Sequence, residues 1–337
     1  MVNVTLQDVA GHAGVSMKTV SRVVNRDAKV RESTRSKVQE SIQALGYRPN
    51  RFARSLAGNK SYLLGLLYDN PSAAYVLAMQ EGVLERCEKE GYGLLIHPCD
   101  FKSNDLVDDI LNLVQQSRVD GLILTPPLSD SRVLVEALET NDIQFVRVSP
   151  AAHHNSGYVV SNESSAVEQL ITNLVSLGHR RIGFIAGGSE HGASQWRLQG
   201  FQQAMKIAGL DVESSLIAQG DFSFESGERC ARTLLDQEDR PSAIFASNDY
   251  MAAGVMKVAM QMGLSIPKDL SIAGFDDAPV ASQLWPPLTT IKQPVKAIAS
   301  QVTGILIYQI LERSEYEPSE TLECELVIRG TTGINLA

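Results

Sequence analysis

Features that would point to several common protein classes are missing from this sequence of 337 residues. No apolar run approaches the roughly 18 residues of a membrane-spanning helix, and the first residues lack the basic-then-apolar pattern of a secretory signal. The four cysteines lie far apart without a CxxC pair, which argues against a zinc site. We therefore expect a cytoplasmic protein with free thiols, no metal and no contact with a membrane.

Catalytic motifs are also missing. None of the six histidines belongs to an HExxH pattern, and neither a GxSxG elbow nor a GxxxxGK[ST] phosphate loop occurs. The pair Gly187-Gly188 lacks the spacing of a dinucleotide fingerprint, and His179 is expected to be structural. Asp276-Asp277 resembles a pair of general acids, but a ligand-binding Asp276 beside an Asp277 outside the pocket is the simpler hypothesis. The sequence thus favours a protein that is not an enzyme and needs no cofactor.

Charge is distributed unevenly along the chain. The net charge is −9, yet residues 1–60 carry 11 Lys and Arg against four acidic residues, whereas the remainder carries 19 against 35. A basic head on an acidic body is typical of a nucleic-acid-binding module joined to another domain. A basic face that is merely solvated would give the same balance, so charge alone leaves both interpretations open.

The head is predicted to form three short helices. The first begins after Thr5, which caps it, and ends at Gly14; the second runs from Met17 to about Asn25, and the third over residues 33–45. Two helices joined by a tight glycine turn make a helix-turn-helix, whose second helix presents its first turns to base edges in the major groove. An ordinary three-helix core is the alternative, but the basic outer face favours DNA binding.

From residue 61 onward, apolar strands alternate with helical stretches. Such alternation predicts parallel sheets with helices on both faces, and two series of it predict an α/β protein of two lobes. The expected strands span residues 63–68, 93–97, 119–124, 143–148, 158–160, 181–186, 216–219, 243–246, 270–273 and 288–291. The expected helices span residues 76–90, 106–117, 131–140, 163–177, 194–208, 225–236 and 251–262. A long helix over 295–311 and a β-rich segment over 321–328 suggest that the chain crosses back to complete both lobes around a hinged cleft.

Short motifs along the whole chain resemble one known family. They include Val4-Thr5-Leu6-Gln7-Asp8-Val9-Ala10, Thr19-Val20-Ser21-Arg22-Val23-Val24-Asn25, Leu177-Gly178-His179-Arg180-Arg181-Ile182, Ala246-Ser247-Asn248-Asp249, Gly274-Phe275-Asp276-Asp277 and Pro287-Leu288-Thr289-Thr290-Ile291. In this order and spacing, the chain resembles the LacI/GalR family of bacterial transcriptional regulators.

The resemblance implies a helix-turn-helix head and a core like a periplasmic sugar-binding protein. The head would span residues 1–60, with a hinge helix at about 50–57. The first lobe would span 61–161 plus about 292–320, and the second lobe 162–291 plus about 321–337. A hinge helix of about two turns is marginal alone and needs DNA or a partner copy to form.

The resemblance also implies a repressor of carbohydrate-utilisation genes that binds double-stranded, pseudo-palindromic operator DNA as a homodimer. The sequence shows no leucine heptads after the final β segment, so we expect a dimer rather than a tetramer. The hinge helix of the family folds on the operator, and its leucine wedges into the minor groove. The expected DNA-binding residues are Thr5, Ser16, Met17, Lys18, Thr19, Ser21, Arg22, Asn25, Asn50, Ala53, Arg54 and Leu56.

A small sugar effector is expected in the cleft between the lobes, at the ends of parallel strands. Carried over one position at a time, the expected effector-binding residues are Asp69, Asn70, Tyr75, Thr125, Arg147, Arg197, Phe222, Asn248 and Asp276. Carboxylate, guanidinium and amide groups suit the vicinal hydroxyls of a sugar. Phe222 is expected to cover its apolar face, although a core role is equally open.

One departure from the family pattern concerns Arg147, a cation where some relatives carry a carboxylate. The pattern of hydroxyls recognised on that side must therefore differ, and Asp69 is one candidate to neutralise the charge. The rival hypothesis for the whole chain is a sugar-binding receptor for transport. That hypothesis predicts a secretory signal and no basic head, and the sequence shows the reverse.

Overall fold

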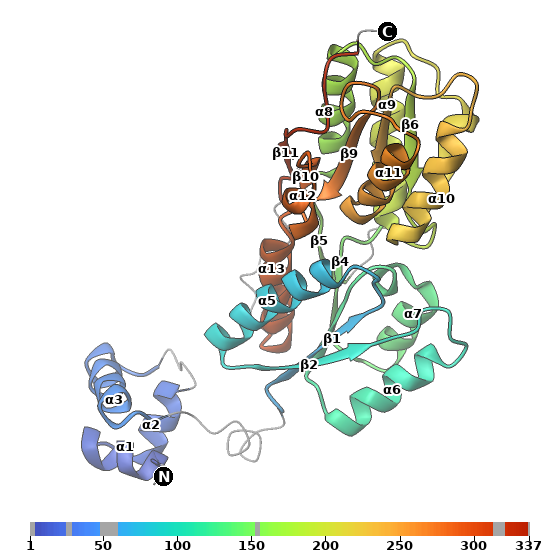
Figure 1. Cartoon of the computed structure of the whole chain (residues 1–337). Helices are drawn as coiled ribbons and strands as arrows, with labels where there is room; N and C mark the ends of the chain where they lie inside the picture. Colours follow the sequence, from blue (N-terminus) through green and yellow to red (C-terminus); the bar gives the residue numbers. More distant parts are fainter. Residues whose placement is uncertain (1–3, 25–28, 48–59, 152–155, 313–320, 336–337) are drawn as a thin grey trace. The chain divides into compact units, whose positions relative to one another are not determined.

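The computed structural model describes residues 4–24, 29–47, 60–151, 156–312 and 321–335. The chain divides into two compact units, Met1–Tyr62 and Leu63–Ala337, and each is described by itself (Figure 1). The first unit is helical, and the second contains two sheets.

Three helices form the first unit: α1 (Leu6–Ala13), α2 (Met17–Val24) and α3 (Glu32–Leu45). The Thr5 side chain accepts a hydrogen bond from the Asp8 backbone N–H, and the Asp8 carboxylate accepts one from the Thr5 N–H at 2.8 Å. This capping box confirms the predicted start of the first helix. The turn to α2 needs a left-handed residue, which Gly14 supplies at φ 63°. The buried core consists of Val9, Ala10, Ala13, Val20, Val23, Val38 and Tyr47.

A five-stranded parallel sheet opens the second unit. Its order is β2-β1-β3-β4-β5. The strands are β1 (Leu63–Tyr68), β2 (Gly93–Pro98), β3 (Gly121–Leu124), β4 (Phe145–Val148) and β5 (Gly157–Val159). The helical elements between them are α5 (Ala73–Glu90), α6 (Leu106–Ser117), η1 (Leu128–Asp130) and α7 (Arg132–Thr140). We call these elements, together with α13 below, the first lobe.

A six-stranded sheet follows in the order β11-β10-β9-β8-β6-β7, with only β11 antiparallel to its neighbour. Its strands are β6 (Ile182–Ala186), β7 (Ile217–Gln219), β8 (Ala243–Ala246), β9 (Ser271–Asp276), β10 (Thr289–Lys292) and β11 (Glu325–Val327). Its helices are α8 (Glu163–Ser176), α9 (Gly192–Ile207), η2 (Ser214–Leu216), α10 (Phe224–Leu235), α11 (Asp249–Gln261) and α12 (Pro279–Gln283). We call these elements the second lobe.

Helix α13 (Val295–Ile310) follows the fifth strand of the second sheet, yet it packs on the first sheet. It lies against α5 and contacts β3, β4 and β5, as Figure 1 shows for α13 and α5. Gly82 of α5 permits this packing, because an added Cβ would lie 2.4 Å from the Lys296 carbonyl oxygen. Residues of α13 on this face, such as Val302 and Leu306, are fully buried.

The crossings between the lobes are tied to one another by backbone contacts. Ser161 pairs with Leu322 in an isolated parallel bridge. The Leu322 N–H donates to the Val160 carbonyl and the Asn162 N–H donates to the Leu322 carbonyl, both at 3.1 Å. Any change in the relative orientation of the two lobes must therefore bend these connecting segments.

The predicted α/β fold class is confirmed, and most element bounds agree within three residues. The elements η1 and α12 were not predicted, because each is too short to show a period. The ninth strand runs on to Asp276, three residues beyond its predicted end, because Asp276 pairs with Lys292 of β10. Among the described residues, no helix is both long and apolar enough to cross a membrane.

Candidate functional site

A cavity that opens in part to solvent lies between the two lobes. The first lobe contributes Asn70, Ser72, Tyr75, Pro126 and Ser149. The second lobe and the crossings contribute Glu163, His191, Ala193, Arg197, Phe222, Asn248, Asp276 and Gln293. Several of these residues follow or end parallel strands, so the cavity lies where an α/β cleft is expected to bind its ligand.

Arg197 of α9 is the buried cation of this cavity. Its Nε donates to Glu163 Oε2 at 2.8 Å, and its Nη1 donates to the Ser247 carbonyl. The guanidinium carbon lies 3.7 Å from the centroid of the Phe275 ring. Because only 4% of Arg197 is exposed, these contacts fix its orientation before any ligand enters.

Asp276 ends β9 and faces Arg197 across a long ion pair, with 3.9 Å between Oδ1 and Nη2. Its φ of 105° and that of Asp277, 55°, lie in a region that favours glycine, so the loop is strained. Buried Asp249 holds this loop by accepting a hydrogen bond from the Ala278 N–H at 2.7 Å. Burial raises the pKa of Asp276 to about 7, with Arg197 opposing the shift and Glu163 adding to it.

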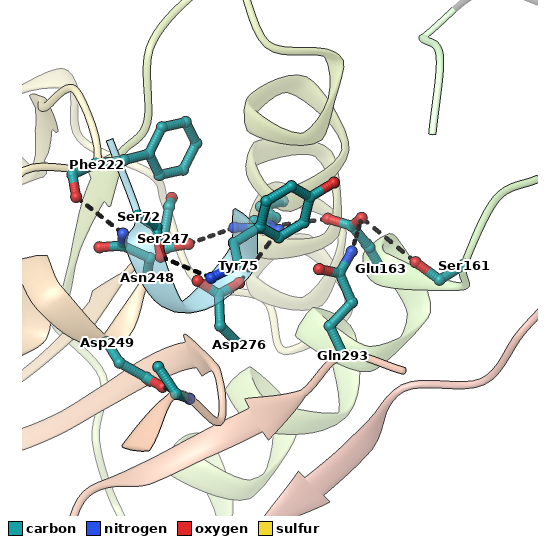
Figure 2. Close-up of polar contacts among 12 residues, drawn as sticks. Ser72, Tyr75, Ser161, Glu163, Phe222, Ser247, Asn248, Asp249, Asp276 and Gln293 are labelled. Atoms are coloured by element: carbon teal, nitrogen blue, oxygen red, sulfur yellow. Dashed lines mark hydrogen bonds and ion pairs between the residues drawn. The ribbon is translucent and has the colours of Figure 1, made fainter. Parts of the chain in front are cut away.

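Asn248 and Phe222 form a second fixed pair in the cavity wall (Figure 2). Asn248 caps α11 by accepting from the Met251 N–H at 2.8 Å, and its amide donates to the Phe222 carbonyl at 2.9 Å. Phe222 has a positive φ of 68°. Its ring packs on Gly187, where a Cβ would lie 2.0 Å from the ring. The pair thus presents an aromatic surface next to an amide.

His191 begins α9 and meets the Phe222 ring edge-on, with 5.0 Å between the ring centroids. Burial lowers the pKa of His191 to about 4. The imidazole is therefore neutral near pH 7 and supplies one donor and one acceptor.

Six of the nine predicted effector-binding residues line this cavity: Asn70, Tyr75, Arg197, Phe222, Asn248 and Asp276. Asp69 and Thr125 lie outside its wall. The Asp69 carboxylate accepts from the Phe101 N–H at 2.8 Å, and the Thr125 hydroxyl donates to the Leu67 carbonyl at 3.1 Å. Asp69 thus joins the loops that follow β1 and β2, and Thr125 joins the end of β3 to β1.

Arg147 also lies outside the cavity wall, buried within the first lobe. Its Nε donates to the Ser156 hydroxyl at 2.8 Å and its Nη1 to the Ser129 carbonyl at 3.3 Å. Burial lowers the pKa of Arg147, and Asp130 is the main carboxylate that opposes the shift. The hypothesis that Asp69 neutralises Arg147 is therefore replaced by one in which Asp130 does so.

Glu163, Gln293, Ser149, Ser72 and His191 line the cavity but were not predicted. Two signals were available in the sequence. Gln293 directly follows β10 and Ser149 directly follows β4, so the strand-end rule, applied to every strand, selects both. Glu163 begins a helix, where an acidic residue is expected anyway for its favourable interaction with the helix dipole, and this hid its second role.

The predicted DNA-binding residues that the structure describes lie in the first unit. Ser16, Met17 and Lys18 are exposed at the start of α2, and Met17 is 54% exposed. Ser16 caps α2, accepting from the Thr19 N–H at 3.2 Å. Ser21 and Arg22 are half-buried one turn further on, and Thr5 serves in the capping box. Predictions for Asn25, Asn50, Ala53, Arg54 and Leu56 lie outside the described residues.

Known proteins share these features. Residues 5–50 match the model of bacterial regulatory proteins of the lacI family, and residues 171–332 match that of a periplasmic binding protein-like domain. The chain is 34% identical over 331 residues to the ribose operon repressor of Escherichia coli strain K12, which covers 97% of this chain and 99% of that protein. The chain belongs to the lacI family of bacterial regulatory proteins. This lacI-family protein is thus a DNA-binding transcriptional regulator rather than a free sugar receptor.

Other relatives agree with this placement. The HTH-type transcriptional repressor PurR of Klebsiella pneumoniae is 36% identical over 329 residues, which is 96% of each chain. A complex of the transcriptional regulator CelR with cellobiose superposes with a TM-score of 0.76 at 28% identity, over 97% of this chain and 99% of that one. The lac repressor dimer bound to operator and the anti-inducer ONPF gives a TM-score of 0.75 at 28% identity, over 98% and 99%.

Proposed function

We propose that this lacI-family protein is a homodimeric, non-enzymatic repressor of carbohydrate-utilisation genes, released or fixed on its operator by a small neutral sugar. The observation that carries the proposal is the cavity between the lobes, where buried Arg197 and Asn248 and half-buried Asp276 lie with the aromatic ring of Phe222. Ionised Asp276 can accept two hydroxyl protons, Arg197 Nη2 can donate, and Phe222 can cover the apolar face of a pyranose or furanose ring.

The proposed division of labour follows the two units. We assign DNA binding to residues 1–60, with the hinge helix at about 50–57, and effector binding to the two lobes with the bounds given above. The relatives support a sugar, because one is named for the ribose operon and another was solved with cellobiose. In the cytoplasm, the protein would be bound to operator DNA in the nucleoid. The proposed function requires no cofactor.

A ligand screen tests this function. Purified protein is heated with a panel of neutral mono- and disaccharides, because a ligand that binds only the folded state raises the melting temperature. Each ligand that does so is then added to an operator-binding titration. A sugar that stabilises the protein and changes operator affinity supports the proposal, and one that stabilises it without changing operator affinity contradicts the regulatory role.

Replacing Lys18 by alanine is expected to weaken operator binding by roughly 1–3 kcal/mol and to relax the preference at one base pair. The exposed ammonium stands at the start of α2, where a recognition helix meets base edges. Binding is measured by fluorescence anisotropy on the operator and on single-base variants. An equal loss on every sequence would show that Lys18 contacts only phosphate.

The protein is expected to sediment as a dimer at micromolar concentration. A helix-turn-helix reads one half-site, so a two-fold operator requires two heads with matching symmetry. Analytical ultracentrifugation measures the mass directly. A monomer or a tetramer under these conditions would contradict the expectation.

A further inference from the structure

Glu163 is the most deeply buried carboxylate at the cavity wall, with 1% of the residue exposed. It is the first residue of α8, directly after the crossing from β5. Its Oε2 accepts from Arg197 Nε at 2.8 Å, and its Oε1 accepts from Gln293 Nε2 at 2.8 Å and from the Ser161 hydroxyl at 3.4 Å (Figure 2). Both carboxylate oxygens are thus engaged.

The contact with Glu163 decides what Arg197 can offer a ligand. A guanidinium binds a carboxylate or phosphate tightly through two parallel N–H groups. Here Nε donates to Glu163 and one Nη1 hydrogen donates to the Ser247 carbonyl. Nη2 is therefore the main donor left for a ligand. The charge of Arg197 is countered by Glu163 and, at 3.9 Å, by Asp276. An anionic ligand would therefore meet two carboxylates, and the guanidinium edge that includes Nε is already used by Glu163.

The same contact decides the orientation of Gln293. Because Nε2 donates to Glu163, the amide oxygen lies on the opposite side, as Figure 2 shows. This Oε1 is buried and has no hydrogen-bond partner among the residues that the structure describes. A buried acceptor without a donor is costly unless a ligand or water supplies one. Gln293 Oε1 and Asp276 together make the wall rich in acceptors.

We propose that Glu163 is a specificity-determining residue, which positions Arg197 and Gln293 so that the cavity binds neutral hydroxyl donors and rejects sugar acids and sugar phosphates. This assignment rests on the proposed function and deepens it. Glu163 also connects the crossing from β5 to the ligand through Arg197 of α9 and Gln293, which precedes α13.

Removing the charge of Glu163 should also change the pH dependence of binding. Asp276 binds hydroxyl donors best when ionised. The charged and titratable groups around it are Arg197 on α9, Glu163 on α8, Tyr75 on α5, Asp249 on α11 and Cys324 just before β11. Glu163 adds to the raised pKa of Asp276. Without that charge, the pH below which a neutral sugar dissociates is expected to fall.

The experiment compares wild type, Glu163→Gln and a matched control, Glu136→Gln, in the full chain. Glu136 is an exposed glutamate of α7 that pairs with exposed Arg132. The probes are neutral and anionic pairs that keep the same ring: glucose with glucuronate and glucose 6-phosphate, and ribose with ribose 5-phosphate. Binding is measured by thermal shift and calorimetry between pH 6 and pH 9, and folding by circular dichroism.

We expect wild type and Glu136→Gln to bind the neutral member of a pair at least about tenfold tighter than its anionic members, since like charges repel strongly when buried. In Glu163→Gln this preference is expected to shrink or invert. The pH at which neutral-sugar binding is half-lost is expected to be lower than in wild type. Unchanged preference and unchanged midpoint in a folded Glu163→Gln protein would overturn the assignment. Wild type that binds an anionic member as tightly would overturn it too, while leaving the proposed function standing.

A second variant covers the case in which Glu163→Gln does not fold. Gln293→Leu removes the acceptor Oε1 but keeps the pair between Glu163 and Arg197. It is expected to bind the neutral sugar at least about tenfold more weakly with the charge preference retained. Wild-type affinity in Gln293→Leu would overturn the role of Gln293. Failure of wild type to bind any neutral sugar of the mono- and disaccharide panel would overturn the proposed function together with this assignment.

Discussion

An Arg197→Met protein is expected to lose about 3–5 kcal/mol of unfolding free energy, because the substitution leaves Glu163 as a buried charge without its cation. Methionine fills most of the same volume, so the loss reports the broken pair rather than a cavity. Effector binding is expected to vanish as well. Urea unfolding of the full chain, followed by circular dichroism, measures the change.

The control for this prediction is Arg132→Met, which breaks an ion pair of similar length on the surface. Arg132 Nε lies 2.6 Å from Glu136 Oε1, and both side chains are largely exposed. Exposed pairs of this kind contribute about 0–1 kcal/mol. Equal stabilities for Arg197→Met and Arg132→Met would contradict the view that Arg197 is needed to keep Glu163 buried.

An Asp276→Ala protein is expected to bind the effector at least about 30-fold more weakly, which corresponds to about 2 kcal/mol. The substitution removes the acceptor that faces Arg197 and leaves the ligand hydroxyls there without a partner. Isothermal calorimetry measures the affinity, and circular dichroism establishes that the variant is folded.

The neighbouring Asp277→Ala is the matched control. Asp277 accepts from Arg329 Nη2 at 2.6 Å and lines a neighbouring cavity, not the one that contains Arg197 and Asn248. Its loss should leave effector affinity close to that of wild type. A folded Asp276→Ala protein that responds at the wild-type effector concentration would refute the assignment. If that variant also failed to bind operator, Asp276 would be a structural residue of the second lobe.

Local features of the sequence predicted much of the fold. In the Thr5–Asp8 capping box each side chain bonds to the backbone N–H of the other residue, so a spacing of three residues is enough to predict it. The strand Leu63–Tyr68 is apolar throughout because helices cover both faces of its sheet. Asn248 and Asp276 were expected from the resemblance to the LacI/GalR family, and the structure places Asn248 after β8 and Asp276 at the end of β9.

The predictions that missed depend on contacts between distant residues. The hydrogen bond from Gln293 to Glu163 joins residues 130 positions apart, and no local pattern encodes it. Arg147 was expected in the pocket because it lies in the fourth strand, where relatives often have a polar contact. Its side chain instead extends to Ser129 and Ser156 inside the first lobe. The pattern of a strand predicts which side chains are buried, but not whether they face a cavity or a buried loop.

The position of α13 has a consequence for how the chain can be made. Translation produces β1 to β5 first, yet the helix that covers one side of that sheet follows β6 to β10. A nascent first lobe must therefore wait on the ribosome with a bare apolar surface, the kind of surface that chaperones hold and that aggregates if unprotected. The first lobe therefore cannot be cut out of the gene as one continuous fragment with its core complete, because α13 comes after β10 in the chain. An isolated first lobe needs α13 joined to the end of the segment that holds β5.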